Sequence, residues 1–197
     1  MIDFSNKPAN DDKYIFVTID NFSRFLFTRP IKNKTPNLTA KAMKDIIDEI
    51  RDKFDKKIGH LLADRGTEFM GEFRELLKRN KIPSSKTIAG QAQSNSMVER
   101  SNGSLKRLLS KYKAIYGGSW FANLKKITGI YNNLKNDNSG FRPNQAVKLK
   151  EGSKEFEELK RNTERRQEAR KPKSMKRVAP NLCWLVMSFV PRFPKGQ

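Results

Sequence analysis

The stretch LLADRGTEF, residues 61–69, decides the fold of this chain. Its first residues complete a short apolar run that begins at Ile58 and is typical of a buried strand. Gly66 then turns the chain into a segment with one apolar stripe at helical spacing. The stripe consists of Phe69, Phe73, Leu76 and Leu77. The sequence therefore predicts a strand, a turn and a helix, with the carboxylate of Asp64 at the end of the strand.

Two further acidic residues accompany Asp64 as candidate metal ligands: Asp3 in MIDFS and Glu99 in QSNSMVERSNGSLK. A nuclease that uses two divalent metals gathers carboxylates from distant segments, because their oxygens hold hard cations beside a phosphodiester. Each residue also has an ordinary structural alternative. Asp64 suits a helix start, and Glu99 suits the first turn of a helix. Asp20, in TIDNFSRF, is a rival to Asp3 for the first ligand position.

The rest of the chain predicts an alternation of strands and helices. Residues 14–20 and 23–30 are two β-rich runs that suggest an antiparallel hairpin, and residues 1–4 supply a strand before it. Further predicted elements are helices at 36–54, 97–112 and 120–134, a strand at 81–88 and a polar loop at 89–96. In the helix from residue 97, Glu99, Asn102 and Lys106 are expected to share a face that points away from the core.

Charge and composition restrict the possible partners. Lysine and arginine outnumber aspartate and glutamate 41 to 21, which gives a formal net charge of +20. Such an excess is expected of a protein that binds polyanions, of which nucleic acid is the natural candidate. The sequence contains no run of eighteen apolar residues, so it offers no membrane-spanning segment. Cys183 and His60 are the only residues of their kinds, which excludes a zinc cluster built from this chain alone.

Composition also divides the chain into three parts. Residues 1–147 are long enough for one α/β core domain. Residues 148–178 contain twelve Lys or Arg against six Asp or Glu and predict a basic, solvated linker helix. Residues 179–197 are apolar again but too few for an independent barrel, so an incomplete carboxy-terminal β module is expected there.

Four blocks of this sequence resemble, in order and spacing, the catalytic core of retroviral-type integrases, and most of all those of Polinton (Maverick) elements and virophages. The blocks are IDNFSRFLFTRPIKNKT (residues 19–35), LLADRGTEF (61–69), GQAQSNSMVERSNGSLKRLL (90–109) and IYNNLKNDNSGFRPNQAV (130–147). The resemblance covers about residues 1–147. Relatives usually carry a proline near Ala92 and a glycine at Ser96, so the loop of this chain is expected to be less flexible. The tail VPRFPKGQ resembles only the opening of a chromodomain-like barrel.

The resemblance implies an RNase H-like fold with a mixed five-stranded sheet and flanking helices. It implies a triad of Asp3, Asp64 and Glu99 that binds two Mg²⁺ ions, for which Mn²⁺ substitutes. It also implies that Gln93, Asn102 and Lys106 face DNA beside the triad. The function implied is DNA integration by a virus or mobile element: 3′-end processing followed by strand transfer.

The same resemblance implies a homo-multimer that holds two ends of double-stranded DNA, in the host nucleus or in a viral nucleoprotein complex. Two other functions stay open at the level of sequence. One is a catalytically inactive, integrase-derived DNA-binding protein. The other is an RNase H-type nuclease that acts on RNA.

Overall fold

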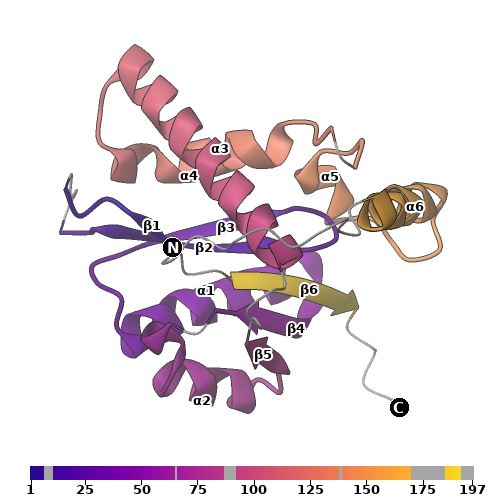
Figure 1. The fold of residues 1–197 in the computed structure, drawn as a ribbon, viewed down its shortest axis with the longest axis horizontal. Coiled ribbons are helices and arrows are strands. Elements are labelled where there is room, and N and C mark those ends of the chain that lie inside the picture. Colours follow the sequence, from indigo (N-terminus) through magenta and orange to yellow (C-terminus); the bar gives the residue numbers. More distant parts are fainter. Residues whose placement is uncertain (7–10, 65, 87–91, 138, 170–184, 192–197) are drawn as a thin grey trace.

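The computed structural model describes residues 1–6, 11–64, 66–86, 92–137, 139–169 and 185–191. The helices are α1 (Pro36–Phe54), α2 (Glu72–Arg79), α3 (Ala92–Tyr116), α4 (Trp120–Asn133), α5 (Pro143–Ala146) and α6 (Lys154–Ala169), with a 3₁₀ turn, η1 (Thr67–Phe69). The strands are β1 (Ile2–Asp3), β2 (Tyr14–Asp20), β3 (Leu26–Ile31), β4 (Lys56–Ala63), β5 (Ser84–Lys86) and β6 (Leu185–Pro191). The strands form one mixed sheet between two helical layers, with α1 and α2 on one face and α3 and α4 on the other (Figure 1).

β2 and β3 form the antiparallel hairpin that the sequence predicts. Their pairing runs from Tyr14↔Ile31 to Ile19↔Leu26. Alternate residues of β2 point to opposite faces of a strand, and here both faces are buried. Phe16 belongs to the core under α1, whereas Val17 belongs to the core under α3 and α4. The hairpin is therefore the shared wall of two hydrophobic cores.

The α1 and α2 layer follows the predicted periodicity closely. α1 begins at Pro36, whose fixed φ suits the first helical turn, and it ends at Asp55 in the left-handed region with φ 49°. Its buried stripe includes Met43 and Ile46, each with 0% exposure, which contributes about 1.5–3 kcal/mol per side chain. α2 begins later than predicted, after Gly71, and buries Phe73, Leu76 and Leu77.

The α3 and α4 layer shows one difference from the prediction. α3 begins at Ala92, so most of the residues expected to form a polar loop are helical instead. The sequence contains no proline near Ala92 and no glycine at Ser96, and without these helix breakers the helix extends toward its amino end. α4 matches its predicted range, and Ser119 caps it by accepting a hydrogen bond from the amide of Ala122 at 3.2 Å.

β6 lies between β2 and β4 and corrects the predicted topology. It pairs in parallel with β2 through Ile19↔Val186 and Asp20↔Met187. It also pairs antiparallel with β4, up to Ala63↔Leu185. The sheet therefore has six strands in the described ranges, where five were predicted, and β6 connects the β1–β2–β3 group to β4 and β5.

Residues 185–191 thus join the core sheet, where an incomplete separate module was expected. A strand-forming run such as LVMSFVP fits any sheet edge whose backbone groups lack partners. The local sequence does not encode which edge it meets. β3 occupies one edge of β2, so β1 and β6 share the opposite edge, one near each end of the strand.

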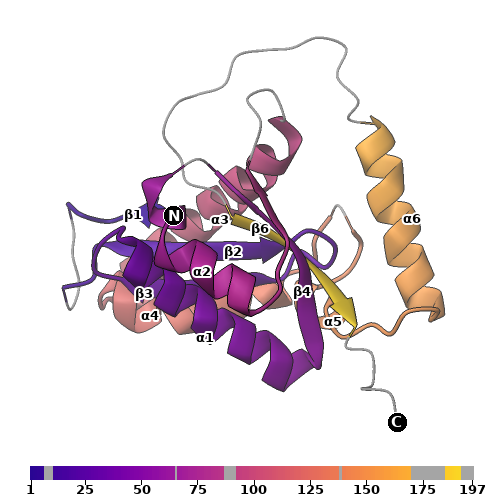
Figure 2. The same ribbon diagram turned by 90° about the horizontal axis from the view of Figure 1, so that it is seen from below.

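α6 forms the described part of the predicted basic linker, and it packs on the core. Leu159 is fully buried, and the ring of Phe156 lies 4.9 Å from the ring of Phe22 in the turn after β2. The side-chain amide of Asn162 donates to the carbonyl of Ser139 at 3.0 Å. The helix therefore docks at the edge of the molecule (Figure 2). No helix within the described ranges is long and apolar enough to cross a membrane.

Candidate active site

Asp64 lies directly after β4, as predicted from the sequence. Its carboxylate oxygen Oδ1 accepts a hydrogen bond from the amide of Gly66 at 2.8 Å. This bond turns the chain from β4 toward η1. Asp64 is half-buried and lines a cavity beside α2, together with Arg74 and Lys78. The turn therefore holds the carboxylate in a defined position next to this cavity.

A second carboxylate, Glu68, lies beside Asp64 and was not singled out from the sequence. Its side chain is buried, and its carbonyl oxygen accepts a hydrogen bond from the hydroxyl of Thr39 at 2.6 Å. A Cβ atom on Gly66 would stand 2.6 Å from Cδ of Glu68 and 3.0 Å from Oδ1 of Asp64. Both carboxylates therefore converge on Gly66, whose lack of a side chain leaves room for them. The sequence signal is a pair of acidic residues, four positions apart, on either side of a glycine. The burial of Glu68 cannot be predicted from the local sequence.

Asp3 lies in β1, opposite Tyr14 of β2, and its side chain is exposed. Its Oδ1 accepts a hydrogen bond from the amide of Ser5 at 2.8 Å. Partial burial raises the pKa of Asp3, but the hydrogen bonds from Ser5 and the positive charges of Lys34 and Lys106 outweigh it and hold the pKa below its ordinary value. Asp3 is therefore ionised at neutral pH, and Lys106 of α3 acts on it electrostatically.

The face of α3 that carries Glu99 differs from the prediction at one residue. Glu99 and Lys106 are exposed, as predicted, but Asn102 is buried with 5% exposure. Asn102 lies on the stripe of α3 that includes Val98 and Leu105, at spacings of four and three residues. The prediction that Asn102 points away from the core is therefore wrong. Its predicted contact with DNA is untested, as are those of Lys106 and of Gln93, whose side chain lies outside the described residues.

The predicted triad is not assembled as a metal site in this conformation. Among the described residues, no three of His, Cys, Asp or Glu lie close enough to hold an ion together. The chemistry of the donors suits a hard divalent cation, because Asp3, Asp64 and Glu99 all offer carboxylate oxygens. The arrangement does not yet fit one. The structure therefore places Asp64 at the expected strand end and Asp3 within the electrostatic reach of α3, but it does not gather the three side chains.

Asp20, the rival for the first ligand position, has a structural role. Its side chain is almost fully buried, and Oδ2 accepts hydrogen bonds from the amide and the hydroxyl of Ser23 at 2.7 and 2.5 Å. Burial raises the pKa of Asp20, and the hydrogen bonds from Ser23 and the positive charge of Lys56 offset this only in part. These contacts hold the turn between β2 and β3, so Asp20 acts as a turn-stabilising residue.

Asp20→Asn is expected to change the pH dependence of stability. Because folding raises the pKa of Asp20, ionisation of its carboxyl group destabilises the folded state. This destabilisation is absent below the ordinary pKa of 3.8 and grows as the pH rises through that value toward the raised pKa of the folded protein. The melting temperature of the variant, relative to wild type, should therefore increase between about pH 4 and about pH 7. Thermal unfolding across this range, with the exposed Asp45→Asn as the control, measures the effect. A constant difference in melting temperature would contradict the assignment.

Part of this chain, including the carboxylate at the end of β4, is similar to a known family. Residues 2–92 match the integrase core domain family. The chain is also 26% identical over 141 residues to the Pro-Pol polyprotein of simian foamy virus type 1, which covers 71% of this chain and 12% of the polyprotein. It is 30% identical over 148 residues to a transposon-derived protein of Caenorhabditis elegans, covering 70% of this chain and 47% of that protein. The chain thus spans less than half the length of these relatives.

Solved integrase structures share the fold. The magnesium complex of the HTLV-2 integrase catalytic core domain has a TM-score of 0.54 at 26% identity, over 64% of this chain and 78% of that one. The catalytic core of BIV integrase has a TM-score of 0.56 at 23% identity, over 66% of this chain and 82% of that one. These likenesses and the match over residues 2–92 show that the chain is similar to integrase cores of the retroviral type. The predicted mixed α/β fold of an integrase catalytic core is confirmed, whereas the predicted five-stranded sheet and separate carboxy-terminal module are not.

Proposed function

We propose that this protein is a DNA integrase of a virus or mobile element, which trims the 3′ ends of element DNA and joins them to a target. The observation that carries the proposal is the integrase core match over residues 2–92, in which Asp64 is held directly after β4. The four sequence blocks favour an element of the Polinton (Maverick) or virophage kind. The relatives include a Pro-Pol polyprotein of a simian foamy virus and a transposon-derived protein, which agrees with a viral or mobile-element origin.

The proposed cofactor is Mg²⁺, with Mn²⁺ as a substitute, and the proposed ligands are Asp3, Asp64 and Glu99. The HTLV-2 neighbour is itself a complex with magnesium. A bound divalent cation supplies positive charge beside the scissile phosphate. Because the three carboxylates are not gathered in this conformation, the proposal requires the amino end of α3 to approach Asp64 and Asp3 when metal and DNA bind.

The remaining site residues are proposed to hold DNA. Lys106 acts on Asp3 electrostatically, which supports a role for its ammonium group in binding a phosphate next to the proposed ligands. Gln93 is proposed as a second DNA contact. Asn102 lies on the buried face of α3, so its side chain has to become exposed before it can contact DNA.

The proposed partners are two ends of double-stranded DNA and further copies of this chain. One structural neighbour, at a TM-score of 0.61 and 22% identity, is the intasome of simian T-cell lymphotropic virus, over 68% of this chain and 48% of that one. The net charge of +20 suits DNA as the partner. The proposed location is the host nucleus or a viral nucleoprotein complex.

A strand-transfer assay tests the proposal. The purified protein is incubated with Mg²⁺ or Mn²⁺, a duplex that carries the element's end and a plasmid target. We expect joined products in both metals and none in chelator. Cleavage of the RNA in an RNA–DNA hybrid without joining of DNA would favour an RNase H-type nuclease. DNA binding without cleavage or joining would favour the inactive DNA-binding protein, which the separated carboxylates also favour.

A further inference from the structure

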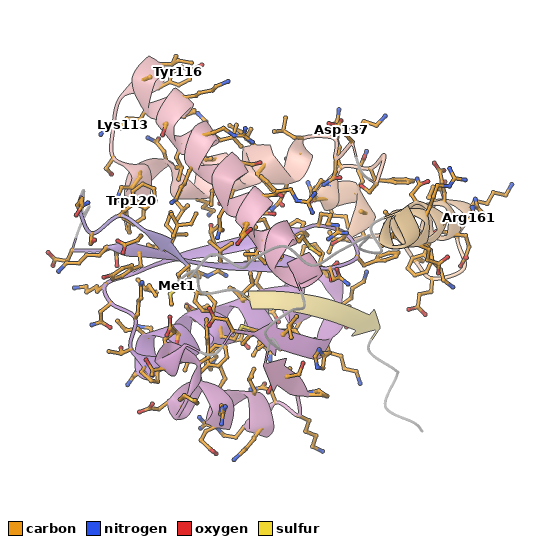
Figure 3. The ribbon with its side chains drawn as sticks, viewed as in Figure 1. Met1, Lys113, Tyr116, Trp120, Asp137 and Arg161 are labelled. Carbon is orange, nitrogen blue, oxygen red and sulfur yellow. The ribbon has the colours of Figure 1, made fainter. Side chains whose placement is uncertain are left out.

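A positively charged groove lies between α3 and the carboxy-terminal end of α4. It consists of two adjoining hollows, the larger of about 620 Å³, which share Ser104, Arg107, Tyr131 and Asn136 in their walls. The cations on the walls are Arg24, Arg100, Lys106, Arg107, Lys111 and Lys135. Asp137, which is labelled in Figure 3, is the one carboxylate among the described lining residues. We name this feature the α3–α4 groove.

One end of the α3–α4 groove is built around a pair of hydroxyl groups. The hydroxyl of Tyr131 lies 3.0 Å from Oγ of Ser101, which donates to the carbonyl of Met97 at 3.0 Å. Burial raises the pKa of Tyr131, whereas the positive charges of Arg24 and Arg100 act in the opposite direction. Two guanidinium groups from distant parts of the chain therefore converge on one neutral hydroxyl pair.

The backbone of Arg24 is constrained in a way that places its side chain in the groove. Arg24 has φ 65°, in the left-handed region that non-glycine residues adopt at a cost of roughly 1 kcal/mol. Its amide donates to the carbonyl of Asp20 at 3.0 Å, and its guanidinium contacts the sulfur of Met97 in α3. The turn that Asp20 and Ser23 stabilise therefore directs a cation toward α3. Costly backbone conformations of this kind concentrate at functional sites.

The cations of the groove form a row with the dimensions of a nucleic-acid strand. Arg100, Arg107 and Lys111 lie on one side of α3, and at 1.5 Å per residue they extend over about 16 Å. One strand of duplex DNA places a phosphate about every 3.4 Å along the helix axis, so the row spans several phosphates. A single small anion would meet only part of this row.

We propose that the α3–α4 groove binds the phosphodiester backbone of DNA and extends the DNA-binding surface from Lys106, which lies on its wall, to Arg107 and Lys111. The identity of the polyanion as DNA rests on the proposed function. Arginine at the Tyr131 end supplies planar donors that match phosphate oxygens, and Arg107 and Lys111 continue the row into solvent. Binding in the groove requires no catalysis. The groove should therefore hold DNA whether or not the site proposed at Asp3, Asp64 and Glu99 cleaves that DNA.

Salt-dependent binding of a duplex of arbitrary sequence tests this proposal. The test variant is Arg107→Gln with Lys111→Gln, two exposed positions that leave the Tyr131 end intact. The matched control is Lys41→Gln with Lys125→Gln, which removes the same charge from exposed positions outside the groove. Each lost phosphate contact should make the slope of log K against log salt shallower by about 0.9. For the groove variant we therefore expect a slope shallower by about 1.8, which corresponds to about 60-fold weaker binding at 0.1 M salt if the two affinities converge at about 1 M.

The control variant should lose much less, because charges more than about 10 Å from the DNA are screened at this salt concentration. Fluorescence anisotropy measures the affinities, and thermal unfolding confirms that both variants fold. Equal changes of slope in the two variants would overturn the groove assignment. A wild-type protein that fails to join DNA but shows the groove-specific change would refute the integrase proposal and leave the groove proposal standing.

Discussion

Asp64→Asn is expected to abolish DNA cleavage and joining while the fold and the affinity for DNA persist. Asparagine has the shape of aspartate, and its carbonyl oxygen can still accept the hydrogen bond from the amide of Gly66. It lacks the negative charge that a divalent cation requires of its ligand. A loss of several kcal/mol of transition-state stabilisation corresponds to a rate at least about 1,000-fold lower. Glu99→Gln should have the same effect.

The measurements are joining yield, duplex affinity and melting temperature for each variant. Glu72→Gln is the matched control, because Glu72 is exposed in the first turn of α2 and has no proposed role in the site. Its activity should equal that of wild type. Retained joining by Asp64→Asn or by Glu99→Gln would remove that residue from the proposed ligand set. An equal loss of joining in Glu72→Gln would show that the joining yield falls with the loss of any negative charge.

Met187→Pro should unfold or strongly destabilise the protein. Met187 pairs with Asp20 on one side and with Leu61 on the other, so its backbone lies in the middle of the sheet. Proline removes a backbone donor and is excluded from the interior of sheets. We expect the free energy of unfolding to fall by about 3 kcal/mol or more, which is a large part of the stability of an ordinary domain.

The control for this substitution is Met187→Ile, which keeps the amide and favours a strand. Its stability should stay close to that of wild type. Urea unfolding followed by circular dichroism compares the two variants. Equal stability of the proline and isoleucine variants would mean that β6 does not pair between β2 and β4 in solution.

Local periodicity was sufficient to predict most of the fold. The hairpin of β2 and β3, the start of α1 at Pro36 and the strand that ends before Asp64 all follow from the order of apolar and polar residues within single segments. The prediction failed at the start of α3, which begins at Ala92 because the chain lacks the proline and glycine that would break the helix there. It also failed at Asn102, because a polar side chain gives no local sign that it lies on the buried stripe of its helix.

The site depends more on tertiary contacts and was less predictable. Asp64 could be placed from its own segment. The burial of Glu68 depends on α1, and the convergence of Arg24 and Arg100 on Tyr131 depends on the docking of α3 and α4 against the hairpin. Residues so far apart in sequence leave no periodic signal of their proximity. The position of β6 between β2 and β4 could not be predicted for the same reason.

The position of β6 also determines the order in which this protein can fold. β6 lies in the middle of the sheet but is the last strand in the described part of the chain. The edges of β2 and β4 that pair with it therefore stay unpaired until residues 185–191 have been synthesised. Pairing between strands so distant in sequence is slow, because a long loop must close first. Until then, the unpaired strand edges can associate with those of other chains. The nascent protein is therefore expected to depend on chaperones until β6 has left the ribosome.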